Sequence, residues 1–231
     1  ALEAMACGTP VVASQVGGAG LVLLAQGSIS QGTLILGAYL VSAVLGVALI
    51  YAFGLRGVAL RGTASQGGSW RELAIMVGLG RRDLTVRAIL WGLAGFAAAL
   101  PVVWGLSLIS LVLVGGDTHP AIPVFISSDD PVDRGLLLFT VCALAPVFEE
   151  FLFRGFLWNH FNKMLGVYSG TLLSALVFAA VHLSLGSFLP LLGLGVILAV
   201  VARHAGSLWA AIVTHALWNL MTVMFVQLLY R

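Results

Sequence analysis

Residues 135–158 read GLLLFTVCALAPVFEEFLFRGFLW, a run that is apolar apart from three charged residues near its middle, Glu149, Glu150 and Arg154. A helix that crosses the hydrocarbon core of a bilayer needs about 20 mostly apolar residues, and this run is long enough. The later stretches Leu172–Val181 and Leu189–Val201 are also apolar on all sides, which excludes the alternating polarity of membrane-spanning β-strands. The sequence therefore predicts transmembrane helices, one of which carries charges at depth.

The composition of the whole chain agrees with a membrane protein. Of its 231 residues, 60% are hydrophobic and only 9% are charged, whereas soluble domains carry about 25% charged residues. The formal net charge of +2 is too small to indicate nucleic-acid binding. We therefore expect an integral membrane protein whose surroundings are the lipid bilayer, with no nucleic-acid partner.

Apolar runs between turn and charge signals predict the number of spans. The fold class is all-α, a polytopic transmembrane helical bundle with about six core spans, and with seven or eight helices in all if further segments add to them. The expected spans lie near residues 33–55, 88–114, 135–158, 169–183, 188–203 and 207–229. The short breaks between the last three predict antiparallel neighbours. Residues 31–231 are expected to form one transmembrane domain.

The charges of the loops predict the orientation of the bundle. The segment between the first two spans, residues 56–87, holds six arginines, whereas residues 115–134 hold four aspartates. Lys163 and Arg203 fall on the same side as the arginines. The positive-inside rule places that side in the cytoplasm, and the compact basic side indicates a prokaryotic plasma membrane. Residues 70–87 are compatible with either a surface helix or a solvated loop.

The first residues have a different character. Residues 1–18, ALEAMACGTPVVASQVGG, resemble a donor-binding segment of retaining GT-B glycosyltransferases, which lies in a Rossmann-like domain. No further alternation of strands and helices completes such a domain here. We therefore expect residues 1–30 to be an N-terminal tail without a domain of its own, left by a fusion, gene boundary or truncation. Residues 10–25 could add a partial span.

Helical spacing separates the three charges of residues 135–158. Glu150 and Arg154 are four residues apart, so they share a helix face and can pair. Glu149 points away from that face and needs a partner from another helix. Charged groups inside a bilayer are costly, about 2.5–3.5 kcal/mol each on insertion scales, and those that are retained commonly mark function.

Polar residues in the later spans offer partners for Glu149. His182 ends one apolar run, and His215 and Asn219, four residues apart, share a helix face. Glu149 facing His182 would activate a water molecule, and His215 with Asn219 would donate hydrogen bonds to an oxyanion. The pair of Glu150 and Arg154 would hold the glutamate helix in place. A lone histidine or asparagine in a span favours a packing role between helices, and a Glu–Arg pair is as often structural as functional, but all six residues together favour a site.

These residues match the pattern of a known family. Glu149-Glu150-Phe-Leu-Phe-Arg154, Phe178-Ala-Ala-Val-His182 and His215-Ala-Leu-Trp-Asn219 resemble the motifs of the CPBP family (CAAX proteases and bacteriocin-processing enzymes, also called the Abi family). The resemblance implies a glutamate-type intramembrane endopeptidase that needs no metal or other cofactor. It implies catalytic roles for Glu149, His182, His215 and Asn219. The implied substrate is a membrane-associated peptide or protein, such as a prenylated CAAX-like segment or a leader peptide.

Other functions remain open at the level of sequence. Glu149, His182 and His215 could instead be three ligands of a zinc metalloprotease with an open fourth position. The polar residues could also stabilise a catalytically silent immunity factor or scaffold. A transporter is a further alternative, although the sequence has no internal repeat. The substrate and the oligomeric state are not determined by these patterns.

Overall fold

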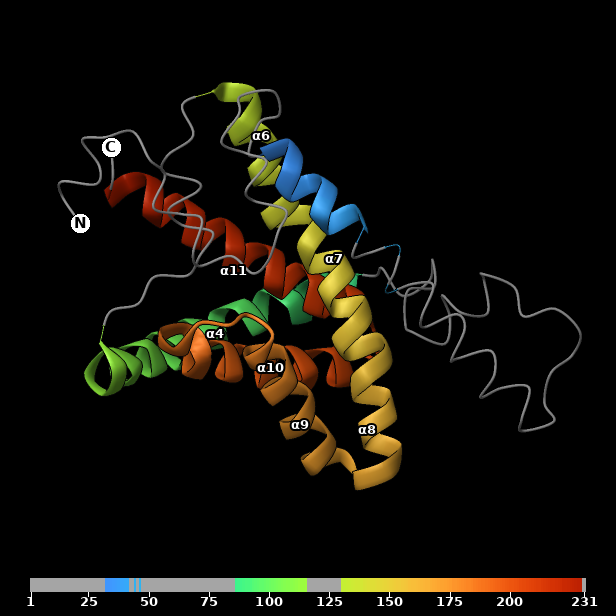
Figure 1. Ribbon diagram of the computed structural model, residues 1–231. Coiled ribbons are helices and arrows are strands. Elements are labelled where there is room, and N and C mark those ends of the chain that lie inside the picture. The colour runs from blue at the N-terminus through green and yellow to red at the C-terminus, as the bar shows by residue number, and fades with distance from the viewer. Residues whose placement is uncertain (1–31, 42–43, 45, 47–85, 116–129, 230–231) are drawn as a thin grey trace, which may run out of the picture.

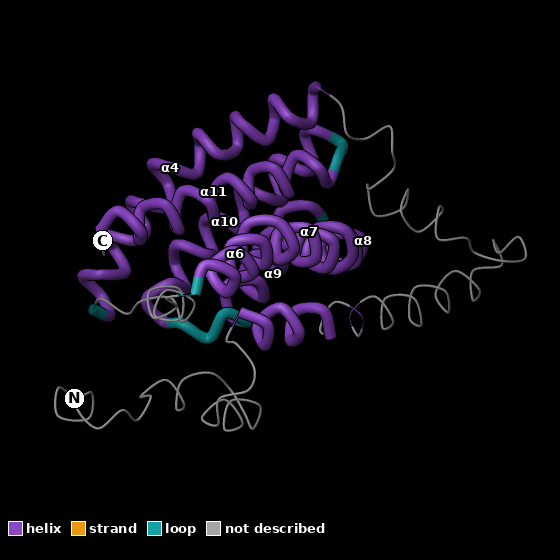
Figure 2. The backbone as a smooth tube through the Cα atoms, turned by 90° about the horizontal axis from the view of Figure 1, so that it is seen from above, coloured by secondary structure: helices purple, strands orange, loops and turns teal. Residues whose placement is uncertain are grey.

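The fold is described from a computed structural model of the chain, which describes residues 32–41, 44, 46, 86–115 and 130–229. The described elements are all helices, as Figures 1 and 2 show. They are a helix over Gly32–Val41, then α4 (Val86–Val114), α6 (Pro131–Phe139), η3 (Thr140–Leu144), α7 (Ala145–Glu150), η4 (Phe151–Leu157), α8 (Trp158–Leu165), α9 (Val167–Ala180), α10 (Leu185–Ala205) and α11 (Leu208–Leu229). The prediction of an all-α membrane bundle is confirmed.

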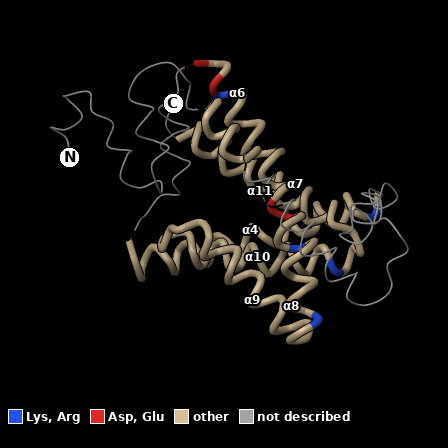
Figure 3. Tube along the Cα trace, turned by 45° about the vertical axis from the view of Figure 1, so that its right-hand side comes forward, with Lys and Arg blue, Asp and Glu red and all other residues tan. Residues whose placement is uncertain are grey.

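Four helical segments are long and apolar enough to cross a membrane: Val86–Val114, Pro131–Leu165, Leu185–Ala205 and Leu208–Leu229. The second of these joins α6, η3, α7, η4 and α8 into one continuous helix, in which η3 and η4 are π-helical turns. Figure 3 shows that these helices carry few charges except at their ends and beside α7. The expected span over 135–158 therefore belongs to a longer helix, which continues to Leu165.

Small residues allow α4, α10 and α11 to pack closely. Gly95 lies where an added Cβ would be 2.5 Å from Oγ1 of Thr214 and 2.6 Å from Cγ2 of Val201. The Thr214 hydroxyl donates a hydrogen bond of 2.9 Å to the backbone oxygen of Gly92. Ala99, Leu194 and other buried apolar residues fill the space between the three helices. This packing forms the core against which the charged helix lies.

The connection between α9 and α10 differs from the expectation. Residues 169–183 were predicted as one span, with the break at 183–187, but α9 ends at Ala180 and α10 already begins at Leu185. The amides of His182 and Leu183 close tight turns onto Ala179 and Ala180. Leu183 adopts a φ of +52°, which is uncommon for a residue other than glycine. His182 therefore lies in a turn just beyond a helix and not within one.

Proline in α10 creates a second constraint near this turn. Pro190 has no amide hydrogen, so the carbonyl of Gly186 lacks its usual partner four residues later. The hydroxyl of Ser110 on α4 donates to that oxygen at 2.7 Å. Ser110 is 2% exposed, so the freed carbonyl is satisfied inside the bundle and ties α10 to α4.

The helix over Gly32–Val41 runs parallel to α6 and α7, as the blue helix in Figure 1 shows. At one end, the Gly32 amide donates to Oδ1 of Asp133 at 3.2 Å. Further along, a Cβ added to Gly46 would lie 2.9 Å from the Phe148 ring. The two segments therefore lie against each other at both of these points.

Several expectations fall outside the described residues. These are the N-terminal tail over 1–30, the greater part of the first span over 33–55, and the arginine-rich segment over 56–87 apart from its last two residues. Most of the acidic loop over 115–134 also lies there. The domain boundary at residue 31 and the membrane orientation therefore stay predictions.

Candidate active site

Glu150 and Arg154 form the pair that their spacing predicts. Nη1 of Arg154 lies 2.9 Å from Oε1 of Glu150, and both side chains are buried. Nη2 of the same guanidinium donates to the backbone oxygen of Gly195 at 3.1 Å, and its Cζ lies 4.5 Å from the centre of the Phe178 ring. The arginine thereby joins the glutamate helix to α10 and α9, so the pair fixes how these helices meet.

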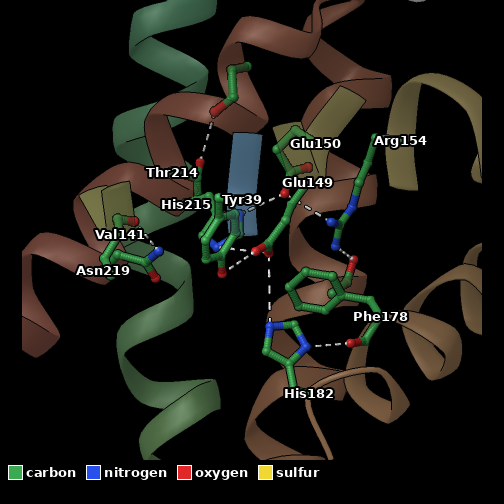
Figure 4. A network of polar contacts seen from close by, with 12 residues as sticks. Tyr39, Val141, Glu149, Glu150, Arg154, Phe178, His182, Thr214, His215 and Asn219 are labelled. Carbon is green, nitrogen blue, oxygen red and sulfur yellow. Dashed lines mark hydrogen bonds and ion pairs between the residues drawn. The ribbon is translucent and has the colours of Figure 1, made fainter. Parts of the chain in front are cut away.

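Glu149 points away from this pair and meets two histidines from other elements. Its Oε2 lies 3.9 Å from Nε2 of His182 and 3.9 Å from Nε2 of His215. Among the described residues, this oxygen is buried without a hydrogen-bond partner. Figure 4 shows the carboxylate between the two rings. Both rings thus face one carboxylate oxygen, too far for a direct hydrogen bond.

The hydrogen-bond partner of Nδ1 shows which nitrogen of the His182 ring carries a hydrogen. Nδ1 lies 2.6 Å from the backbone oxygen of Phe178. A carbonyl oxygen only accepts hydrogen bonds, so Nδ1 carries a hydrogen. In the neutral ring Nε2 is then the acceptor nitrogen. His182 therefore turns an acceptor toward Glu149.

His215 has a partner that the sequence spacing does not reveal. Its Nδ1 lies 2.8 Å from Oε1 of Glu150, the oxygen that also accepts from Arg154. His215 is 3% exposed, and the carboxylate holds its ring in one orientation. Glu150 is therefore more than the partner of Arg154, because it also fixes a histidine of α11.

Asn219 is held by an irregularity in the helix that precedes Glu149. The Ala145 amide donates to Thr140 in the π-helical turn η3, and Pro146 has no amide hydrogen to offer. The carbonyl of Val141 instead accepts a hydrogen bond of 2.8 Å from Nδ2 of Asn219. The second hydrogen on Nδ2 is free to serve another acceptor. Pro146 is the sequence signal that could have indicated this contact.

Tyr39 also reaches Glu149 and was not expected to belong to the site. Its hydroxyl donates to Oε1 of Glu149 over 3.5 Å, and Figure 4 shows the ring beside the carboxylate. The two residues are 110 positions apart. A lone tyrosine in an apolar run has no motif around it, so the sequence offered no signal for this role.

An apolar cavity opens from these polar groups. Its volume is about 740 Å³, and its wall contains Glu149, His182, His215 and Asn219 together with aliphatic and aromatic residues of α4, α10 and α11. Cavities of this size are typical of small-molecule and cofactor sites. The polar cluster therefore has space beside it for an apolar ligand.

The structure thus brings together the residues that the sequence selected. Five are linked through the contacts above, and Asn219 lines the same cavity. His160 and His204 lie exposed on α8 and α10, apart from this cluster. Within the described part of the chain, no group of three or more His, Cys, Asp or Glu side chains is arranged to hold a metal ion.

The fold and this cluster define a membrane protein with a buried cluster of glutamate and histidine side chains beside a cavity. Residues 131–221 match the family model of the type II CAAX prenyl endopeptidase Rce1-like proteins. The match over these residues confirms the predicted resemblance and supports a membrane peptidase as the class of protein. No curated protein and no solved structure matched the chain.

Proposed function

We propose that the chain hydrolyses a peptide bond of a membrane-associated substrate, with Glu149 and His182 activating the attacking water. The observation that carries this proposal is the position of Oε2 of Glu149, 3.9 Å from Nε2 of each histidine. Two atoms at this separation can both lie about 2.8 Å from one water molecule. A water molecule has two hydrogens to donate. Oε2 of Glu149 and Nε2 of His182 can each accept one of them.

The chemistry follows from these acceptors. The water oxygen attacks the carbonyl carbon of the scissile amide. Glu149 takes one proton of the water, while Nε2 of His182 accepts a hydrogen bond from the same water. When the tetrahedral intermediate collapses, the carbon–nitrogen bond breaks and the same proton passes to the leaving nitrogen. The products are a carboxyl group and an amine, and the carboxylate is regenerated.

His215 and Asn219 are proposed to stabilise the oxyanion. Nδ2 of Asn219 keeps a second hydrogen for this purpose beyond its bond to Val141. His215 can donate from Nε2 when both ring nitrogens are protonated, with Nδ1 donating to Glu150 at 2.8 Å. Donors aimed at a developing negative charge typically contribute about a hundredfold to a thousandfold in kcat.

The substrate is proposed to be a CAAX-type peptide that carries a prenyl chain. The cavity beside the polar cluster supports this assignment, because its wall is mostly apolar and a prenyl chain would bury apolar surface there. A leader peptide without a lipid is the alternative. A prenylated peptide and its unmodified counterpart, compared at equal concentration, distinguish the two by their KM values.

Peptide cleavage by the purified protein in detergent tests the proposal. We expect Glu149→Gln and His182→Ala to lower kcat by about a hundredfold to ten-thousandfold. His160→Ala is the matched control, because this histidine is exposed on α8. A folded Glu149→Gln variant with the activity of the wild type would contradict the mechanism. A folded wild type that cleaves no peptide would favour the immunity or scaffold alternative.

The location of the substrate depends on membrane orientation. We propose that residues 31–231 form one domain in a prokaryotic plasma membrane, with the arginine-rich segment over 56–87 in the cytoplasm. The excess of arginine there supports this orientation. Labelling of single cysteines introduced at residues 61 and 117, in intact cells with a reagent that does not cross membranes, should modify only the second.

A further inference from the structure

The helix over Gly32–Val41 lies outside the residues that match the family, 131–221, yet it is fixed beside them. An added Cβ at Gly32 would lie 2.7 Å from Oδ1 and 2.9 Å from the backbone oxygen of Asp133. The Gly32 amide donates to the same carboxylate, and Asp133 is 7% exposed. A buried contact to a backbone amide, with no room for a side chain, sets the position of this helix along α6.

This anchoring brings Tyr39 to the catalytic carboxylate. The tyrosine lies seven residues after Gly32, and its hydroxyl donates to Oε1 of Glu149. The other oxygen, Oε2, faces His182 and His215. The two carboxylate oxygens therefore have different surroundings, one bound by a phenol and one turned toward the histidines.

We propose that Tyr39 is a positioning residue of the peptidase site, which holds Oε1 of Glu149 so that Oε2 is directed at the water. This inference rests on the proposed function, because it assigns Tyr39 a part in the same reaction. A carboxylate without this donor can rotate about its terminal carbon–carbon bond. In this site the same rotation would break the hydrogen bond from the Tyr39 hydroxyl. The phenol thus limits the orientations that Glu149 adopts before it accepts a proton.

The long hydrogen bond is consistent with this role. At 3.5 Å it is longer, and therefore weaker, than the hydrogen bonds of 2.5–2.7 Å that O–H donors typically make to carboxylates. Catalytic hydrogen bonds are often long without substrate and shorten in the complex. The consequence should therefore be seen mainly in kcat, and at about tenfold it should be smaller than the effect of losing Glu149 itself.

The test is Tyr39→Phe, which keeps the ring and removes only the hydroxyl. Tyr168→Phe is the matched control, because Tyr168 on α9 is 90% exposed. In the chain of residues 1–231 in detergent, we expect Tyr39→Phe to lower kcat about tenfold, with KM and melting temperature close to those of the wild type. Tyr168→Phe should change none of the three. A residue that only packs would alter the melting temperature, and one that only binds substrate would alter KM, so either pattern with unchanged kcat overturns the proposal.

A second measurement separates this inference from the proposed function. Thermal unfolding of the wild type, Tyr39→Phe, Glu149→Leu and the double variant forms a double-mutant cycle that needs no activity. We expect non-additive effects, because Glu149→Leu leaves the part-buried Tyr39 hydroxyl without its acceptor, so Tyr39→Phe should raise the melting temperature in that background and leave it nearly unchanged in the wild type. Additive effects would overturn the role of Tyr39 even if Glu149 proves essential. Non-additive effects would support the contact even if no peptide is cleaved, in which case only the proposed function fails.

Discussion

Nδ1 of His215 lies 2.8 Å from Oε1 of Glu150, although the two residues are 65 positions apart in the sequence. The same oxygen accepts from Arg154 at 2.9 Å. One buried carboxylate therefore serves both an arginine on its own helix and a histidine on α11. This sharing predicts that Glu150 has one effect on stability and a separate effect on the reaction.

The first prediction separates these effects with Glu150→Met and Arg154→Met. Each single change leaves one buried charge without its partner, which typically costs about 3–5 kcal/mol of unfolding free energy. The double variant removes both charges and should recover most of that loss. Its kcat should stay low, because His215 still lacks the carboxylate that orients it. Thermal unfolding and peptide cleavage provide the two readouts, and recovery of kcat in the double variant would show that His215 needs no such partner.

The second prediction concerns two side chains that satisfy freed backbone carbonyls. Asn219 donates to Val141 and Ser110 donates to Gly186, so Asn219→Leu and Ser110→Ala should each destabilise the protein by about 1–3 kcal/mol. Only the Asn219 variant should also lower kcat, by about a hundredfold or more, if its second hydrogen serves the oxyanion. Equal kcat values for the two variants would reduce Asn219 to a structural role.

The sequence predicted those parts of the site that lie close together along one helix. The spacing of Glu150 and Arg154 indicated their pairing, and Glu149, on another face, indicated a partner on another helix. In the structure Oε2 of Glu149 lies 3.9 Å from two histidines. Contacts between helices far apart in the chain have no such periodic signal. The contact of Tyr39 with Glu149 was missed for this reason.

The fold was predictable to a similar degree. Apolar runs located the four described segments that are able to cross a membrane, because a membrane imposes a minimum length on each helix. They did not locate the end of α9, since Val181 and Leu183 continue the apolar run although the backbone turns there. Hydropathy records where a segment is buried in lipid and not where its backbone changes direction.

The third prediction tests the zinc alternative. Treatment with 1,10-phenanthroline or EDTA should leave kcat unchanged, because the proposed water is activated by Glu149 and His182 alone. Metal content, measured by mass spectrometry before and after treatment, shows whether the chelator had anything to remove. A lasting loss of activity that added zinc restores would favour Glu149, His182 and His215 as ligands.

The fourth prediction compares two glycines of α4 that differ in their surroundings. At Gly95, a Cβ would meet Thr214 and Val201 at 2.5–2.6 Å, whereas nothing lies within 4 Å of a Cβ at Gly105. Gly95→Ala should therefore force α4 away from α11 and destabilise the protein by about 1–3 kcal/mol. Gly105→Ala should stabilise it by about 0.5–1 kcal/mol, because alanine favours a helix over glycine.

Thermal unfolding of both variants in the same detergent measures the difference, and the peptidase assay adds a second comparison. Thr214 is the residue before His215, and its hydroxyl donates to the backbone oxygen of Gly92 on α4. A displaced α11 would therefore also move the histidine relative to Glu149. We therefore expect Gly95→Ala to lower kcat and Gly105→Ala to leave it unchanged. Equal stability of the two variants would mean that α4 and α11 leave room for a Cβ at Gly95, contrary to the distance of 2.5 Å between that Cβ and Oγ1 of Thr214.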